Sequence, residues 1–203
     1  MNIVSFLISF VFLISAVVIH EFAHGWVAYR LGDNTAKFSG RLTLNPLAHI
    51  DPFATVILPL LLFITTRGQF VFGAAKPVPI NYWSLKNPRR DMMLIGASGP
   101  AANFIFATLV AVLLKGLPLP ILLILILRQL VVINVVLGVF NLIPIPPLDG
   151  SRILMGLLPQ NLANYYARLE QVGIIIVMAL VALGALNFLV WPLVYFILGI
   201  LIK

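Results

Sequence analysis

Long apolar runs separated by short polar segments make up almost the whole chain. The first run, residues 3–19, has only three serines as polar interruptions. A helix needs about 20 predominantly apolar residues to cross a bilayer, and several runs approach or exceed that length. The predicted transmembrane helices are residues 3–31, 91–115, 121–143, 168–186 and 188–202. The pattern therefore predicts an all-α polytopic membrane protein with about five full transmembrane helices.

Three other segments depart from this pattern. Residues 53–66 are apolar, but they are broken by Pro59 and fall below the length of an ordinary span. Residues 35–45 alternate loosely between apolar and polar positions, which predicts a short β-hairpin. Residues 69–80 contain two prolines, which fit only at the edge or end of a sheet. We therefore expect a small β-hairpin and edge element beside the helices.

Composition supports a membrane protein and excludes other classes. Of the 203 residues, 62% are hydrophobic and 9% are charged, and the mean hydropathy is +1.10. We expect a single domain over residues 1–203, and we interpret the first apolar run as a retained span because it lacks the features of a signal peptide. The chain has no cysteine, which excludes disulfides and thiolate metal ligands. The net charge of +7 comes from residues scattered between apolar runs, so we expect no nucleic-acid partner.

The first apolar run ends in the sequence His-Glu-Phe-Ala-His at residues 20–24. Positions i and i+4 of a helix share one face, so His20 and His24 can bind a single ion. Glu21 can then act as the base toward a water activated by the metal. The alternative is a histidine pair hydrogen-bonded to neighbouring helices. Because ionisable groups inside a membrane segment are costly and usually functional, we favour the metal site.

A second motif, residues 141–150, follows the apolar run that ends near residue 143. Three of its residues are prolines within four positions, so the backbone cannot continue as a regular helix. Asp149 offers an oxygen ligand suited to zinc, and Gly150 allows close approach of the backbone. The alternative is that Asp149 caps the next helix, with Arg152 as a surface partner.

The placement of basic residues predicts how the two motifs meet. Arg30, Lys37 and Arg41 follow the first helix, so its C-terminal end, with the histidines, is predicted to be cytoplasmic. If residues 53–66 crossed the membrane fully, Asp149 would lie near the opposite face. If they dip in and return, the basic loop that follows stays cytoplasmic and Asp149 comes beside the histidines. We favour the dipping segment.

These motifs resemble the site-2 protease family of intramembrane zinc metalloproteases, most of all its compact prokaryotic members without a PDZ or CBS domain. The matching segments are residues 20–24, the sequence Ser-Gly-Pro-Ala-Ala-Asn at residues 98–103, and residues 141–150. The implied protein is a multi-pass protein of a prokaryotic cell membrane with its active site near the cytoplasmic side. Its implied partners are the lipid bilayer and its substrates, single-span or other membrane proteins cut in or near their transmembrane segments.

The resemblance also implies roles for individual residues. His20, His24 and Asp149 would hold one Zn²⁺ per chain, and Glu21 would be the catalytic base. Asn141 would donate a hydrogen bond to the substrate or the oxyanion.

The middle motif and the flanking glycine are expected to have structural or substrate-binding roles. These residues are Gly99, Pro100, Asn103 and Gly150. Asn103 lies one turn into its span, where it either steadies helix packing or contacts the substrate. His49 is either an additional ligand or, as its Asn-Pro and Asp-Pro neighbours favour, a turn residue bonded to backbone.

Two other functions compete with proteolysis. A membrane metal transporter would also place His and Asp in the membrane, but it predicts ligands along a path rather than at one depth. An inactive pseudoprotease that only binds membrane proteins would not need Glu21 beside the metal. For the protease, we expect an unwound substrate to add as a strand to residues 35–45 and 69–80.

Overall fold

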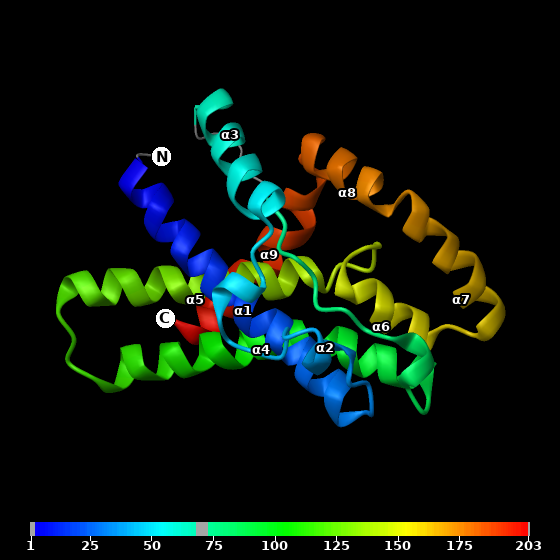
Figure 1. Cartoon of the computed structure of the whole chain (residues 1–203). Coiled ribbons are helices and arrows are strands. Elements are labelled where there is room, and N and C mark those ends of the chain that lie inside the picture. Colours follow the sequence, from blue (N-terminus) through cyan, green and yellow to red (C-terminus); the bar gives the residue numbers. More distant parts are fainter. Residues whose placement is uncertain (1–2, 68–72, 203) are drawn as a thin grey trace.

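The computed structural model describes residues 3–67 and 73–202, and every regular element in these ranges is helical (Figure 1). Helices α4 (Pro88–Gly116) and α5 (Ile121–Asn141) run antiparallel, side by side, and the long helix α1 (Ile3–Arg30) crosses them. Helix α9 (Ala185–Leu201) packs against α5. The expected all-α membrane architecture agrees with this arrangement.

Small and β-branched side chains fill the interior between α4, α5 and α9. Ala107, Val131, Val135 and Val194 are each completely buried there. The outer surfaces of the helices carry large apolar side chains instead, and Phe188 on α9 is 87% exposed. A surface of this kind is stable against lipid rather than water.

Three helices in the described part of the chain are long and apolar enough to cross a membrane, namely α1, α4 and α5. Their bounds agree with the expected spans to within a few residues. Of the two C-terminal spans expected from the sequence, the first is a much shorter helix than predicted, and the second has about the predicted length but falls short of the roughly 20 residues of a full span. Helix α8 (Gly173–Ala182) has 10 residues, about 15 Å of helix, and α9 has 17.

Helix breaks explain why the C-terminal region does not give two full spans. Helices α7 (Gln160–Ala167) and η4 (Arg168–Gln171) precede α8 and are bent by 67° from it, so at most this pair counts as a fourth span. Gly184 then separates α8 from α9 with a φ of 68°, a left-handed conformation that glycine adopts without strain. A continuous run of apolar residues indicates contact with lipid, but it does not show where a helix ends within the run.

The short apolar segment leaves the body of the protein and returns to it. It consists of a π-helical turn, η2 (Pro52–Ile57), followed by α3 (Leu58–Thr65). On the return, the N–H of Ala74 donates to the carbonyl of Ala54 at 3.0 Å. The two arms of this excursion are therefore hydrogen-bonded to each other, while the dipping of residues 53–66 into the membrane stays a prediction.

The predicted β-hairpin is wrong, because residues 35–45 instead begin with the helical turn α2 (Thr35–Phe38) and continue without a strand. The buried Asp33 carboxylate accepts hydrogen bonds from the N–H and the hydroxyl of Thr35, which favours a helical turn at this point. Of the predicted edge segment, residues 69–72 lie outside the described residues. Residues 73–81 have no regular secondary structure.

The remaining elements are short and connect the long helices. They are η1 (Pro46–Ala48), η3 (Tyr82–Ser84) and α6 (Asp149–Leu157).

Candidate metal centre

His20, His24 and Asp149 meet in the interior between α1, α4 and α6. Oδ2 of Asp149 lies 2.9 Å from Nε2 of His20 and 3.2 Å from Nε2 of His24. All three residues are buried, and one potential ligand atom from each lies within 4.8 Å of the others. This is the sole group of three or more such residues in the described part of the chain that could hold a metal ion.

Two glycines permit close approaches of the backbone at this site. A Cβ atom at Gly99 would lie 2.5 Å from Nε2 of His24 and 2.6 Å from Nε2 of His20, so only glycine leaves the imidazoles room. A Cβ atom at Gly150 would overlap the carbonyl of Leu142, so the turn before α6 also depends on glycine. Pro100 is buried next to Gly99 inside α4. The glycine and proline positions of the sequence motifs therefore shape the site.

The outer nitrogens of both imidazoles are held by hydrogen-bond acceptors. Nδ1 of His24 lies 2.7 Å from the backbone carbonyl of Ile95, which can only accept, so this Nδ1 carries the proton. Nδ1 of His20 lies 2.7 Å from Oδ1 of Asn103. Ser98 also donates its hydroxyl to the carbonyl of Ile95, at 2.6 Å.

The neighbouring Asn134 fixes which way the Asn103 amide faces. Nδ2 of Asn103 donates to the carbonyl of Ala16 and to Oδ1 of Asn134, both at 3.0 Å. Nδ2 of Asn134 in turn donates to the carbonyl of Leu130 at 2.9 Å. Both asparagines are completely buried. Oδ1 of Asn103 must therefore face His20, and Nδ1 of His20 is the donor.

This hydrogen-bonding pattern fits a bound cation. With both Nδ1 atoms protonated, the Nε2 atoms of His20 and His24 present lone pairs to each other at a distance of 3.0 Å. The Asp149 oxygen adds a third electron-rich atom at the same point. Three electron-rich atoms at one point favour a bound cation, and two imidazoles with one carboxylate are a common ligand set for catalytic zinc.

Asp149 does not cap its helix. Helix α6 begins at Asp149 itself, with Leu148 at the N-cap position and no side-chain capping hydrogen bond, and Nη1 of Arg152 lies 3.9 Å from Oδ1 of Asp149. The alternative interpretation of Asp149 as a helix cap is therefore wrong.

Glu21 lies beside the cluster and is held by a separate segment. Its Oε2 accepts a hydrogen bond from the backbone N–H of Val78 at 2.8 Å. Val78 stands between Pro77 and Pro79, so it supplies the one backbone donor of these three residues. Since Val78 uses Oε2, the other carboxylate oxygen, Oε1, remains to act on a proton.

The two other candidate polar residues lie outside the cluster. Nδ2 of Asn141 donates to the carbonyl of Leu137 on its own helix, at 3.0 Å. His49 is buried, and its Nε2 donates to the carbonyl of Thr43 at 2.9 Å. The expectation that His49 is a turn residue bonded to backbone agrees with this contact.

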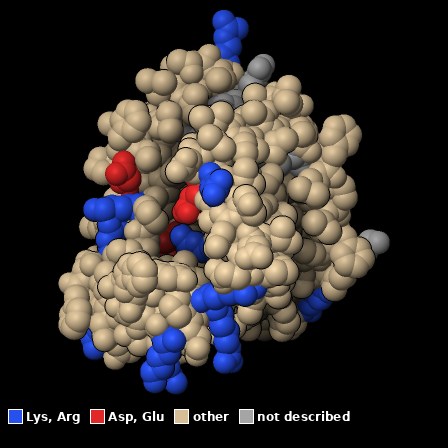
Figure 2. Space-filling view, turned by 90° about the vertical axis from the view of Figure 1, so that its right-hand side faces the viewer, with Lys and Arg blue, Asp and Glu red and all other residues tan. Residues whose placement is uncertain are grey.

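A cleft borders the metal centre on the face that carries α6 and α7. It has a volume of about 350 Å³, and its lining includes Ser151, Arg152 and Glu170. In Figure 2, Lys and Arg side chains are spread around a hollow on this face, and acidic side chains lie at its edge and within it. Ser151 and Arg152, two and three residues after Asp149 on α6, connect this cleft to the candidate ligand along the chain.

Fold and site together define a helical membrane protein with a buried group able to hold a metal ion. The family model of peptidase family M50 matches residues 7–121 and 119–184, which is most of the chain. The chain belongs to this family, the site-2 proteases, and the resemblance expected from the motifs is confirmed. It is thus a member of a family of zinc metalloproteases.

Several relatives support this membership. The protein named "Putative zinc metalloprotease YwhC" from Bacillus subtilis is 37% identical over 190 residues, which cover 89% of this chain and 83% of the relative. The protein named "Putative zinc metalloprotease Rip2" from Mycolicibacterium smegmatis is 31% identical over 192 residues, covering 89% of this chain and 68% of the relative. A Rip2 protein from Mycobacterium tuberculosis is 30% identical over 184 residues, covering 90% of this chain and 69% of the relative. No solved structure matches the chain.

Sequence reasoning missed two contacts at the site. Asn134 is a polar residue in the middle of an apolar helix. Such residues are rare in spans unless they have a partner or a function, so the sequence alone could have identified Asn134 as a candidate. The contact of Val78 with Glu21 uses a backbone N–H, so its side chain gives no signal.

Proposed function

We propose that this protein is a zinc-dependent intramembrane endopeptidase that hydrolyses peptide bonds in or near transmembrane segments of membrane proteins. One observation carries the proposal, namely that His20, His24 and Asp149 converge from α1 and α6 with Glu21 next to them. Membership in a metalloprotease family supports the same chemistry.

In this mechanism, His20, His24 and Asp149 bind the metal through Nε2, Nε2 and a carboxylate oxygen. A zinc ion bound there supplies a Lewis acid that acidifies water and polarises a carbonyl. Glu21 takes the water proton at the oxygen left free by Val78 and later delivers it to the leaving amine. Asn141 donates its amide to the developing oxyanion after rotating away from the Leu137 carbonyl.

The substrate must expose a peptide bond that a transmembrane helix would hide. We propose that it unwinds and adds as a strand alongside residues 73–81. The N–H groups of Ala74, Lys76 and Val78 donate to the carbonyl of Ala54, the carbonyl of His49 and the Glu21 carboxylate. Bonding by alternate residues to one side is typical of extended backbone, and the opposite edge presents the N–H of Ala75 and the carbonyls of Ala75, Pro77 and Pro79 to a partner strand.

We further propose a multi-pass protein of a prokaryotic cell membrane with the site near the cytoplasmic face. Arg30 ends α1, and Lys86, Arg89 and Arg90 precede or begin α4, so these charges lie at the ends of the two helices nearest the metal centre. Cytoplasmic loops are enriched in Lys and Arg, which supports this orientation. The cleft beside α6 would then supply cytoplasmic water.

Cleavage by the purified protein tests the function. Wild type and Glu21→Gln are loaded with zinc and incubated with a panel of single-span membrane proteins. We expect cleavage by wild type, loss of cleavage on chelation, and at least about a hundredfold lower rate in the variant with zinc content retained. Metal uptake into vesicles without cleavage would instead indicate a transporter. Stable binding of substrate, with neither cleavage nor uptake, would indicate an inactive pseudoprotease.

A further inference from the structure

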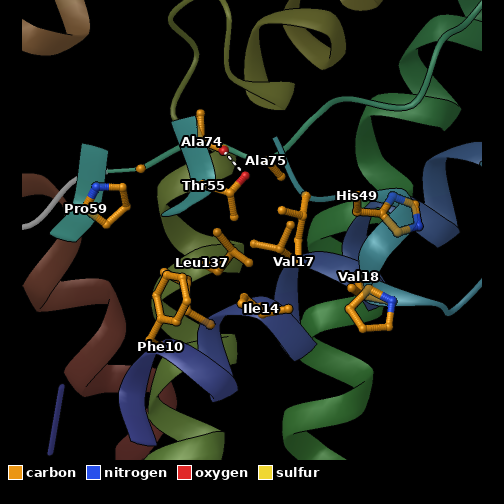
Figure 3. A pocket seen from close by; sticks show the side chains of 14 residues that line it. Phe10, Ile14, Val17, Val18, His49, Thr55, Pro59, Ala74, Ala75 and Leu137 are labelled. Carbon is orange, nitrogen blue, oxygen red and sulfur yellow. Dashed lines mark hydrogen bonds between the residues drawn. The ribbon is translucent and has the colours of Figure 1, made fainter. Parts of the chain in front are cut away.

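A cavity next to the metal centre provides a further binding site. It has a volume of about 100 Å³ and lies between α1, α5, the η2–α3 excursion and the returning segment (Figure 3). Phe10, Ile14 and Val17 of α1 form one wall, and Leu137 of α5 and the small residues Ala74 and Ala75 form others. The lining is mostly apolar.

Each of three walls leads directly to a residue of the proposed active site. On α1, Phe10, Ile14 and Val17 lie on one helical stripe whose next member, four residues on, is Glu21. On α5, Leu137 is followed four residues later by Asn141. These spacings put the cavity about one helical turn, roughly 5.4 Å, from the reacting groups on both helices.

The third wall also runs toward Glu21. Ala74 and Ala75 line the cavity, and Val78, which holds Glu21, is four and three residues further along the same extended segment. A strand advances about 3.3 Å per residue, so a substrate strand beside this segment has a side chain at the cavity three or four positions from the residue opposite Val78.

The polar atom of Thr55 at the cavity is already satisfied. The Thr55 hydroxyl donates to the Ala74 carbonyl at 2.7 Å, drawn in Figure 3, and accepts from the N–H of Asp51 at 2.9 Å. His49 also lines the cavity, and its buried Nδ1 has no hydrogen-bond partner and can only accept, because Nε2 is the donor. Neither residue offers a donor, so an acidic side chain would be desolvated there without compensation. An apolar protein cavity of about 150 Å³ binds benzene, so one of 100 Å³ suits a branched aliphatic side chain.

We propose that this cavity is a specificity subsite that takes a leucine-sized apolar side chain of the substrate, within about four residues of the scissile bond. The inference rests on the proposed function and adds to it a preferred residue type at a defined position. The small side chains of Ala74 and Ala75 set the depth of the subsite, and Leu137 limits its width.

Paired substitutions in the full-length protein test the subsite. In a single-span substrate that wild type cleaves, the scissile bond is mapped by mass spectrometry and neighbouring positions are changed to Ala, Leu, Phe or Asp. One position should prefer Leu over Ala and Asp by about tenfold or more in kcat/KM. Ala75→Leu should reduce the Leu-to-Ala ratio at that position about tenfold, and Leu137→Ala should raise the Phe-to-Leu ratio.

The ratios of kcat/KM between substrates distinguish a change in specificity from a loss of folding, because misfolding lowers the cleavage of all substrates together. Matched controls are Ala182→Leu on α8 and Leu125→Ala on α5, both at exposed positions, and neither should change the ratios. Unchanged ratios in both Ala75→Leu and Leu137→Ala would overturn the subsite but not the proposed protease function. The same result is expected if a lipid chain, and not a substrate side chain, fills the cavity. Absence of zinc-dependent cleavage by wild type would reject the proposed function and the subsite with it.

Discussion

Oδ1 of Asn103 accepts a hydrogen bond from Nδ1 of His20 at 2.7 Å, within the buried interior shared by α1 and α4. This contact holds the His20 ring with its Nε2 lone pair facing His24 and Asp149. Asn103 therefore orients the candidate ligand His20, a role that differs from the two that the sequence left open. Partners of this kind typically contribute 10–100-fold to metal affinity.

Replacing Asn103 with Ala should weaken zinc binding by about 10- to 100-fold, because Nδ1 loses its acceptor and the ring its orientation. Competition with a chromophoric chelator measures the affinity directly. Asn103→Asp provides the comparison, since it retains the acceptor oxygen. An unchanged zinc affinity in Asn103→Ala would contradict the assigned role.

Asn134 should act through Asn103. Asn134→Ala removes the acceptor that fixes the Asn103 amide, so we expect a smaller loss of zinc affinity than in Asn103→Ala. The double variant should lose little more than Asn103→Ala alone, because the two amides form one chain of hydrogen bonds. Additive losses in such a double-mutant cycle would show that the two asparagines act independently.

Gly99→Ala should abolish zinc binding while the protein remains folded in detergent. The added Cβ atom would lie 2.5 Å from Nε2 of His24 and 2.6 Å from Nε2 of His20, which displaces at least one imidazole. Gly116→Ala on the same helix is the matched control, because a Cβ atom there meets nothing within 4 Å. Zinc content per chain distinguishes the two variants, and equal contents would refute the tight fit at Gly99.

Val78→Pro should lower kcat for cleavage by about tenfold or more without changing zinc content. The substitution removes the N–H that holds Oε2 of Glu21, and the segment already contains prolines on both sides. Val78→Ala keeps the N–H and loses only side-chain packing, so its kcat should stay closer to wild type. Equal loss in both variants would mean that the Val78 side chain, and not its N–H, supports the site.

The sequence predicted the metal group well because its determinants are local or topological. His20 and His24 share a face because they are four residues apart on one helix. The approach of Asp149 was inferred from the number of membrane crossings between the two motifs, which charges and segment lengths predict. The dipping of residues 53–66 was inferred on the same basis and stays a prediction. No knowledge of side-chain packing was required for these features.

The missed features depend on particular tertiary contacts. Residues 35–45 form no hairpin, because Asp33 binds Thr35 and favours a helical turn over the weak alternation of the sequence. The break at Gly184 ends α8 within a continuous apolar run, so hydropathy counted too many full spans. The contact of Val78 with Glu21 joins residues that are 57 positions apart through a backbone atom, which no residue type reports.

Membrane topology can be tested cleanly because the chain has no cysteine. Single cysteines at Lys37 and Lys86 place probes after α1 and before α4, and a cysteine at Leu117 places one just beyond the other end of α4. If residues 53–66 dip and return, an impermeant thiol reagent added outside intact cells should label position 117 and spare positions 37 and 86, which it should reach only after the membrane is opened. Full crossing by residues 53–66 would instead put positions 37 and 86 on opposite sides. That result would separate the imidazoles from Asp149 and is incompatible with the metal centre described above.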